Sequence, residues 1–231
     1  MKTILETDIE FFCDIEAPCF KNLQADETEL VRASKTQVLF RKGENLSKQG
    51  AFASYILFVI HGMAKQYIEG EGGRNFNLRI ISPGEFVGIS AVFSGNTFNY
   101  SSVALTDCQA YLIEKDAINK VIRQNALFAF GLTSRYCQQN GNLLNTIGSL
   151  MFRQMNGRMA ETLLYINSLG KVGENVFVHL SRKDIGDFAG ISTESAVKLL
   201  KNFEKDGLIA LYDKDIIILK PEILQEISRR G

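Results

Sequence analysis

The sequence has no surplus of either charge and no tryptophan. Its 231 residues hold 26 Lys and Arg against 26 Asp and Glu, so bulk charge does not point to a nucleic-acid partner. This balance argues against nonspecific coating of nucleic acid, but a sequence-specific binder stays open because local charge placement matters more than the sum. With 45% hydrophobic and 23% charged residues, the chain can bury a core in one large or two modest domains.

Long hydrophobic runs are also lacking, and none approaches the length of a transmembrane helix. The first residues, MKTILETDIEFFCDIE, carry acids and lack a basic stretch followed by an apolar one, so they do not resemble a signal peptide. We therefore expect a soluble, cytoplasmic protein with no membrane partner.

Cysteine and histidine are too few and too scattered to form a metal or catalytic motif. The cysteines match no zinc spacing, and a reducing compartment disfavours disulfides. His61 and His179 are far apart in the sequence, and no Ser/His/acid set or carboxylate pair can be placed. We therefore expect no enzyme activity, no metal and no cofactor. The cysteines are Cys13, Cys19, Cys108 and Cys137.

Residues 36–113 are rich in β-forming residues and punctuated by glycine-containing turns. Short strands at such regular spacing predict a small sandwich or a rolled barrel. The run EGEGGR (69–74) lies between two strand patterns with no helix after it, which favours a hairpin loop over a phosphate cradle. The strand-like runs are TQVLFRKGE, SYILFVIHG, AKQYIEGEGG, NFNLRIISPGE, FVGISAVF and SSVALTDCQAYLI.

From residue 116 the pattern becomes helical, with a short helix over 116–123 and a long one over 126–150. One stripe of the long helix recurs at alternating gaps of three and four, which is typical of a coiled-coil seam. A second apolar row, from Leu132 to Leu150, lies beside it. Two stripes predict two partners, namely the β domain and the same helix of a second subunit. The seam comprises Phe130, Thr133, Cys137, Asn140, Leu144, Ile147 and Met151.

The remaining sequence alternates helix and strand patterns. RMAETLLYINSL (158–169) predicts an amphipathic helix, and VFVHL (176–180) predicts a strand. LIALY (208–212) and IIILK (216–220) predict a hairpin, and PEILQEISRR (221–230) predicts a last helix.

Two short helices joined by a tight turn are predicted within SRKDIGDFAGISTESAVKLLKNFEKDGLI (181–209). Ser181 can cap the first helix, with Asp184 as its capping-box partner. Gly190 can end that helix in the left-handed conformation, and Ser192 can cap the second. Together with the hairpin that follows, the pattern predicts a winged helix-turn-helix.

The outward face of the second helix carries side chains that could reach base edges in a major groove. Glu194 could accept a hydrogen bond from a cytosine amino group, and Lys198 could donate to guanine O6 or N7. Lys183 and Ser192 could hold phosphates. The alternative is an ordinary solvated Glu194–Lys198 pair, worth a few tenths of a kcal/mol. The candidate DNA-binding residues are Lys183, Ser192, Thr193, Glu194, Ser195, Val197, Lys198 and Lys201.

Six fragments in order resemble the bacterial transcription regulators of the cyclic-AMP receptor protein and fumarate–nitrate reduction regulator (CRP/FNR) family. The resemblance implies an α+β fold: a β-roll sensory domain with an N-terminal helix (1–123), a dimerisation helix (124–152) and a winged helix-turn-helix (153–231). The β-roll would be a double-stranded β-helix of the cyclic-nucleotide-binding kind. The fragments are FRKGE, QGAFASYILFVIHGMAK, LRIISPGEFVGISAVF, VALTDCQAYLI, RMAETLLYI and LSRKDIGDFAGISTESAVKLLKNFEKDGLI.

The resemblance implies base-reading positions at Glu194, Val197 and Lys198, although family members usually carry arginine, with its two-pronged donor, in place of Lys198. Cyclic-nucleotide binders place a glutamate where Ile89 stands and an Arg-Ser pair within the stretch that here reads NYSS (99–102). A cyclic phosphate buried without a cation is poorly compensated, so we expect that cyclic AMP is not the effector. The candidate effector pocket comprises Gly88, Ile89, Ser90, Tyr100, Ser101 and Ser102.

Iron–sulfur sensors of this family combine a cysteine-rich N-terminus with one cysteine in the β-roll. Cys13, Cys19 and Cys108 echo that arrangement only faintly, and nothing selects an axial haem ligand, so we expect neither group. We expect a homodimer that binds a double-stranded DNA operator, hinges near 151–156, and contacts RNA polymerase if it activates. Its signal would be an unknown small-molecule effector. The alternative is a small-molecule-binding β-roll whose helix-turn-helix makes protein contacts only.

Overall fold

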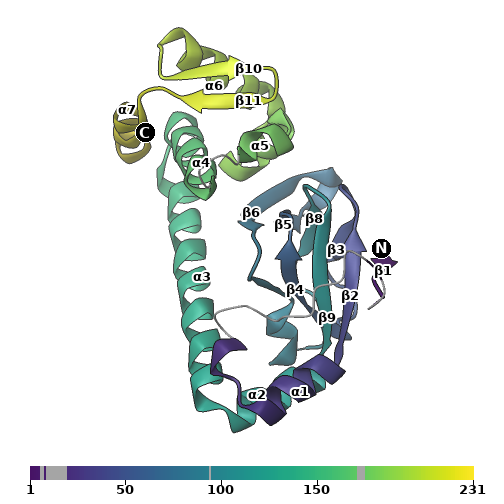
Figure 1. Cartoon of the computed structure of the whole chain (residues 1–231). Helices are drawn as coiled ribbons and strands as arrows, with labels where there is room; N and C mark the ends of the chain where they lie inside the picture. Colours follow the sequence, from purple (N-terminus) through teal and green to yellow (C-terminus); the bar gives the residue numbers. More distant parts are fainter. Residues whose placement is uncertain (6–7, 9–19, 94, 171–174) are drawn as a thin grey trace. The chain divides into compact units, whose positions relative to one another are not determined.

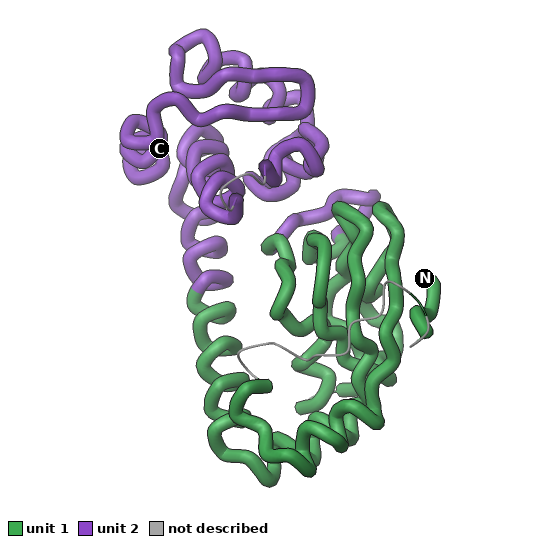
Figure 2. Tube along the Cα trace, in the orientation of Figure 1, with its two compact units in different colours: residues 1–69, 79–141 green, residues 70–78, 142–231 purple. Residues whose placement is uncertain are grey.

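The computed structural model of the protein describes residues 1–5, 8, 20–93, 95–170 and 175–231 (Figure 1). The chain forms two compact units, drawn in different colours in Figure 2. One unit consists of residues 1–69 and 79–141, and the other of residues 70–78 and 142–231. Cys13 and Cys19, which entered the iron–sulfur hypothesis, lie outside the described residues.

The β-rich part is a roll of two antiparallel sheets, as the regular strand spacing predicts. One sheet has the order β1-β2-β9-β4-β7 and the other has the order β3-β8-β5-β6. The run at 69–74 is the β5–β6 loop, which confirms the hairpin prediction. The strands are β1 (Lys2–Thr3), β2 (Lys35–Phe40), β3 (Asn45–Ser47), β4 (Tyr55–His61), β5 (Ala64–Glu69), β6 (Asn75–Ile81), β7 (Phe86–Val87), β8 (Ser101–Ala104) and β9 (Cys108–Glu114).

Strand β4 separates two hydrophobic cores, because successive side chains of a strand point to opposite faces. Leu57 and Val59 pack inside the roll with residues of both sheets. Ile56 and Phe58 face the other way and pack with residues of three helices. These helices are α1 (Ala25–Ala33), α2 (Lys115–Gln124) and α3 (Ala126–Phe152). Phe20 of the 3-10 helix η1 (Phe20–Asn22) packs in the same core, and η2 (Glu71–Gly73) lies elsewhere in the chain.

The stretch FVGISAVF is a strand only in its first two residues, so the prediction of a longer strand was wrong. Gly88 has a φ of 82°, a left-handed conformation that breaks the extended backbone. The 3-10 helix η3 (Ile89–Val92) follows directly. The turn therefore redirects the chain away from the sheet after β7.

The first turns of α3 are buried on one side and exposed on the other. Of the second predicted row only Leu132 is buried, and Tyr136 and Leu143 are exposed, so a continuous buried stripe is not formed. Phe128 and Leu132 are buried in the helix-side core. Phe130, Leu144 and Met151 on the other stripe are 73%, 61% and 70% exposed. Since these three residues lie on a seven-residue repeat, the exposed stripe runs along most of the helix.

The C-terminal part contains the predicted winged helix-turn-helix. Helix α3 ends at Phe152 and α4 begins at Met155, so the helical conformation is interrupted within the predicted hinge region. Its elements are α4 (Met155–Leu169), η4 (Val176–His179), α5 (Arg182–Ala189), α6 (Thr193–Lys205), β10 (Ile209–Tyr212), β11 (Asp215–Ile218) and α7 (Pro221–Arg230).

The segment VFVHL is a 3-10 turn, so the strand predicted there was wrong. The Asn175 side chain accepts a hydrogen bond from the Phe177 nitrogen at 3.0 Å and so caps the start of this 3-10 turn. Val176 and Phe177 are buried all the same. Short apolar runs satisfy burial in either conformation, which is why periodicity alone misjudged this one.

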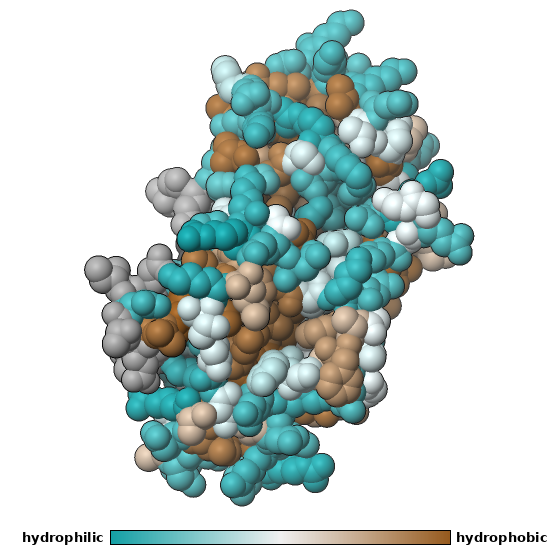
Figure 3. Space-filling view, turned by 90° about the vertical axis from the view of Figure 1, so that its right-hand side faces the viewer, coloured by the Kyte–Doolittle hydropathy of each residue, from teal (hydrophilic) through white to brown (hydrophobic). Residues whose placement is uncertain are grey.

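Hydrophilic side chains spread widely over the face drawn in Figure 3, with hydrophobic ones gathered between them. Within the described ranges, no helix is both long enough and apolar enough to cross a membrane.

Candidate nucleic-acid interface

Helix α5 begins and ends as its sequence predicts. Ser181 Oγ accepts from the Asp184 nitrogen at 3.1 Å, and the Asp184 carboxylate accepts from the Ser181 nitrogen at 2.8 Å. Gly190 ends the helix with a φ of 63°. A Cβ at this position would lie 2.7 Å from Leu150 Cδ2, so both backbone conformation and close packing require glycine.

Helix α6 is held by its N-cap and by its buried stripe. Ser192 Oγ accepts from the Ser195 nitrogen at 3.1 Å. Ala196, Leu200 and Phe203 are buried at spacings of four and three, against α5 and β10. The opposite face of α6 is consequently turned to solvent.

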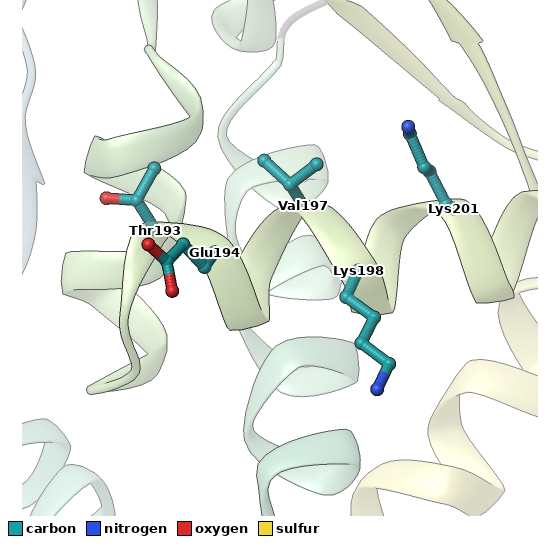
Figure 4. Close-up of a pocket in the computed structure, with 5 residues that line it drawn as sticks. All are labelled: Thr193, Glu194, Val197, Lys198 and Lys201. Carbon is teal, nitrogen blue, oxygen red and sulfur yellow. The ribbon is translucent and has the colours of Figure 1, made fainter.

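The exposed face of α6 carries two rows of side chains (Figure 4). Thr193, Val197 and Lys201 form one row at spacings of four, and Glu194 and Lys198 form the other. Together they line one open, shallow depression. Glu194 and Lys198 are exposed and point away from each other, and the described residues include no hydrogen-bond or ion-pair partner for either. The i,i+4 pairing that the sequence left open is therefore not formed.

Lys183 has a partner that the sequence reasoning did not weigh. Its Nζ lies 2.6 Å from Asp187 Oδ2, one helical turn further along α5. The lysine side chain is half exposed, and exposed ion pairs contribute about 0–1 kcal/mol. A phosphate group could therefore compete for this lysine, although Asp187 weakens the local positive potential.

The β10–β11 hairpin pairs Ile209 with Ile218 and Tyr212 with Asp215, as predicted for the wing. Arg182, the first residue of α5, donates from its guanidinium to the Asp213 carbonyl oxygen at 2.7 Å. Sequence reasoning missed Arg182, because nothing in the pattern links it to a turn 31 residues further on. The hairpin tip carries Asp213 and Asp215 around Lys214, so its charge is unfavourable for phosphate.

The fold places only some of the residues of the candidate effector pocket next to one another. The Gly88 nitrogen donates to Tyr100 Oη at 2.8 Å, whereas Ile89 packs against the helix-side core. Ser101 and Ser102 are fully buried. Ser102 Oγ lies 2.7 Å from Ser47 Oγ, and Ser101 Oγ donates to Glu69.

The cysteines that are described differ sharply in environment. Burial raises the pKa of the Cys108 thiol to about 12, so this residue stays protonated inside the roll. Cys137 is exposed on α3. Among the residues whose placement is described, no group of three or more His, Cys, Asp and Glu side chains is arranged to hold a metal ion.

Comparison with known families identifies both parts of the chain. Residues 37–125 match the cyclic nucleotide-binding domain, and residues 157–227 match the Crp-like helix-turn-helix domain. The cAMP-activated global transcriptional regulator CRP of Salmonella typhimurium is 25% identical over 177 residues, covering 75% of this chain and 84% of that protein.

Solved structures share the fold over most of the chain. FixK2 from Bradyrhizobium japonicum superposes with a TM-score of 0.76 at 20% identity, covering 84% of this chain and 97% of that one. A CRP/FNR-family transcriptional regulator from Thermus thermophilus gives a TM-score of 0.69 at 21% identity, covering 84% of this chain and 100% of that one.

Proposed function

The chain belongs to the CRP/FNR family of DNA-binding transcription regulators, and from this premise we propose that it acts as a symmetric homodimer that reads two half-sites of a DNA operator. The β-roll would occupy residues 1–123, the dimerisation helix 124–152 and the DNA-binding domain 153–231. The protein would act in the cytoplasm, and it would also contact RNA polymerase if it activates transcription. No catalytic role is part of the proposal.

The exposed face of α6 carries this proposal. A helix fits the major groove, and a recognition helix contacts base edges with residues near its N-terminus. Glu194 and Lys198 lie in the first two turns of α6 and are exposed without partners among the described side chains. Both are therefore available to bases, Glu194 as an acceptor for a cytosine amino group and Lys198 as a donor to guanine.

The phosphate contacts in the proposal come from α5 and from the start of α6. Lys183 would leave Asp187 for a phosphate oxygen, and the N-terminus of α6 would present the hydroxyls of Ser192, Thr193 and Ser195. Such contacts set the position of the protein on the duplex but carry no sequence information.

The exposed stripe of α3 supports the homodimer. Phe130, Cys137, Leu144 and Met151 follow a seven-residue repeat, interleaved with Thr133, Asn140 and Ile147. Exposed apolar residues at such spacing are stabilised when a second helix covers them. A parallel pairing would present two α6 helices, which must lie about 34 Å apart to enter successive major grooves.

Cyclic AMP is not the effector in this proposal. The cyclic phosphate would need cations or free donors, whereas the candidate pocket contains no arginine, and Ser101 and Ser102 are engaged with Glu69 and Ser47. The residues present therefore do not fit a cyclic nucleotide.

Selection of bound duplexes from a random DNA pool tests the proposed function directly. We expect enrichment of a two-fold symmetric sequence with half-sites one helical turn apart. A purified protein that retards no duplex at low salt, with or without cell metabolites, would contradict the proposal. It would favour the alternative, in which the helix-turn-helix contacts another protein.

A further inference from the structure

The buried Ser101 hydroxyl joins a hydrogen-bond network that reaches the surface of the β-roll at Lys48. Ser101 Oγ donates to the Glu69 carboxylate, which also accepts from Lys48 Nζ at 2.5 Å. The Glu69 nitrogen donates to Gln49 Oε1 at 3.0 Å, and the Gln49 nitrogen donates to Ser101 Oγ at 2.9 Å. An anionic ligand entering here would have to displace a carboxylate from its partners.

A second network lies next to Tyr100. Arg79 contacts Glu85 through NH1 at 2.5 Å and donates from Nε to Gln66 Oε1 at 2.9 Å. The arginine and glutamate side chains are largely buried, so their pairing is weakly screened by solvent. Arg79 is therefore already neutralised and does not provide a free cation for a phosphate.

Two aromatic side chains close the turn at Gly88. A Cβ at Gly88 would lie 2.4 Å from Phe98 Cε1, so the phenyl ring rests directly on this glycine. Tyr100 Oη accepts from the Gly88 nitrogen at 2.8 Å. Both rings pack against the core inside the roll. The ring of Phe98 and the hydroxyl of Tyr100 thus take up the space and the N–H group at Gly88.

The backbone fixes this arrangement from the opposite side. The Phe98 nitrogen donates to the Ala51 carbonyl at 3.0 Å, and the Gly50 nitrogen donates to the Phe98 carbonyl at 2.8 Å. Burial raises the pKa of Tyr100 above its ordinary value, so the phenol stays neutral. Both residues are therefore held in place by backbone contacts as well as by packing.

We propose that Phe98 and Tyr100 form an aromatic plug that replaces a small-molecule effector, so that the roll is closed by its own side chains and DNA binding needs no added ligand. The second half of this statement rests on the proposed function, and the first half does not. The plug also explains how a domain that matches a cyclic nucleotide-binding model can lack the groups that hold a cyclic nucleotide.

The plug lies beside the contact between the roll and α3. Arg135 of α3 donates to the Gly84 carbonyl oxygen at 2.9 Å, in the turn that precedes β7. Tyr136 lies close enough to Tyr100 to interact with it electrostatically. A closed plug therefore holds the 84–88 turn against the helix that carries the seam.

Thermal melting of the full-length protein tests the plug without reference to DNA. The probes are cyclic AMP, cyclic GMP and indole, a flat apolar molecule about the size of the deleted ring. We expect none of them to raise the melting temperature of the wild type. Phe98→Ala should lower the melting temperature by roughly 4–8 °C, because it opens a cavity, and indole should restore part of the loss.

Two further variants keep the test decisive. Phe93→Ala removes an exposed phenyl ring from the same loop and should melt like the wild type, with no response to indole. Tyr100→Phe keeps the ring and deletes only the acceptor for Gly88, so it should lower the melting temperature by roughly 2–4 °C. If a cyclic nucleotide stabilises the wild type, or if Phe98→Ala melts like Phe93→Ala, the plug is refuted.

DNA binding gives the second readout. On the duplex selected as described above, affinity should change by less than about twofold when cyclic nucleotides or cell metabolites are added. Dependence of binding on any of them would overturn effector independence. A protein that binds no duplex at all would refute the proposed function, while the melting experiments would still decide whether the plug exists.

Discussion

Arg182 NH2 lies 2.7 Å from the backbone carbonyl oxygen of Asp213 and so ties the start of α5 to the tip of the β10–β11 hairpin. Burial lowers the pKa of Arg182, against the opposing effect of Asp213 and Asp215. Its second terminal nitrogen is buried, and no partner for it lies within the described part of the chain. The hydrogen bond and the nearby carboxylates therefore compensate a partly desolvated guanidinium.

Replacing Arg182 tests how much this link contributes. Arg182→Ala should reduce the free energy of unfolding by about 1–2 kcal/mol, since the net contribution of a charge-assisted hydrogen bond is lost. Urea denaturation monitored by circular dichroism measures the change. Arg229→Ala, at an exposed position of α7, is the matched control and should be neutral. Equal stability of the two variants would show that the link is unimportant.

Lys198 should determine specificity, and Lys183 should not. Lys198→Ala should weaken binding to the selected operator by about 1–3 kcal/mol while leaving nonspecific binding nearly unchanged. Lys183→Ala should weaken specific and nonspecific binding alike, because a phosphate contact carries no sequence information. Fluorescence anisotropy with operator and scrambled duplexes separates the two effects. An unchanged specificity ratio in Lys198→Ala would remove this lysine from the base-reading set.

Leu144 should be essential for the homodimer. Leu144→Glu places a charge at the centre of the exposed α3 stripe, so two copies would repel each other where they should pack. We expect a monomer by sedimentation equilibrium and at least tenfold weaker operator binding, because the two half-sites are no longer engaged together. Leu219→Glu changes another exposed leucine, outside α3, and should leave both properties intact. A dimeric Leu144→Glu protein would place the interface elsewhere.

The Cys108 thiol should make the free energy of unfolding decrease at alkaline pH. Its pKa in the folded protein is raised to about 12 from an ordinary value of 9.0, so the thiol keeps its proton where the unfolded chain loses it. The stabilisation is complete below pH 9 and falls by about 1.4 kcal/mol per pH unit above it. Stability curves of wild type and Cys108→Ala should therefore converge as the pH rises above 9.

Local signals in the sequence were sufficient for the helix-turn-helix and for the last helix. Ser181, Gly190 and Ser192 act within a few residues of themselves, and caps of this kind can be recognised without knowing the fold. The seam of α3 was equally predictable, since a seven-residue repeat needs no tertiary information. The helices, their caps and the exposure of the α3 stripe were confirmed. The pairing of two α3 helices and the roles assigned to the exposed side chains remain predictions.

The sequence failed where distant residues decide the conformation. The Gly88 turn is covered by Phe98 and Tyr100, which come from a later segment. Glu69 and Ser101 are 32 residues apart and meet only because β5 pairs with β8. No periodicity in the sequence encodes such contacts, so the state of the effector pocket could not be predicted.

Strand β4 has a consequence for how this chain can diverge. Because Ile56 and Phe58 fill one core while Leu57 and Val59 fill the other, inserting or deleting a single residue in the strand would exchange the occupants of both at once. Homologues should therefore vary β4 by substitution and place length changes in the loops on either side of it.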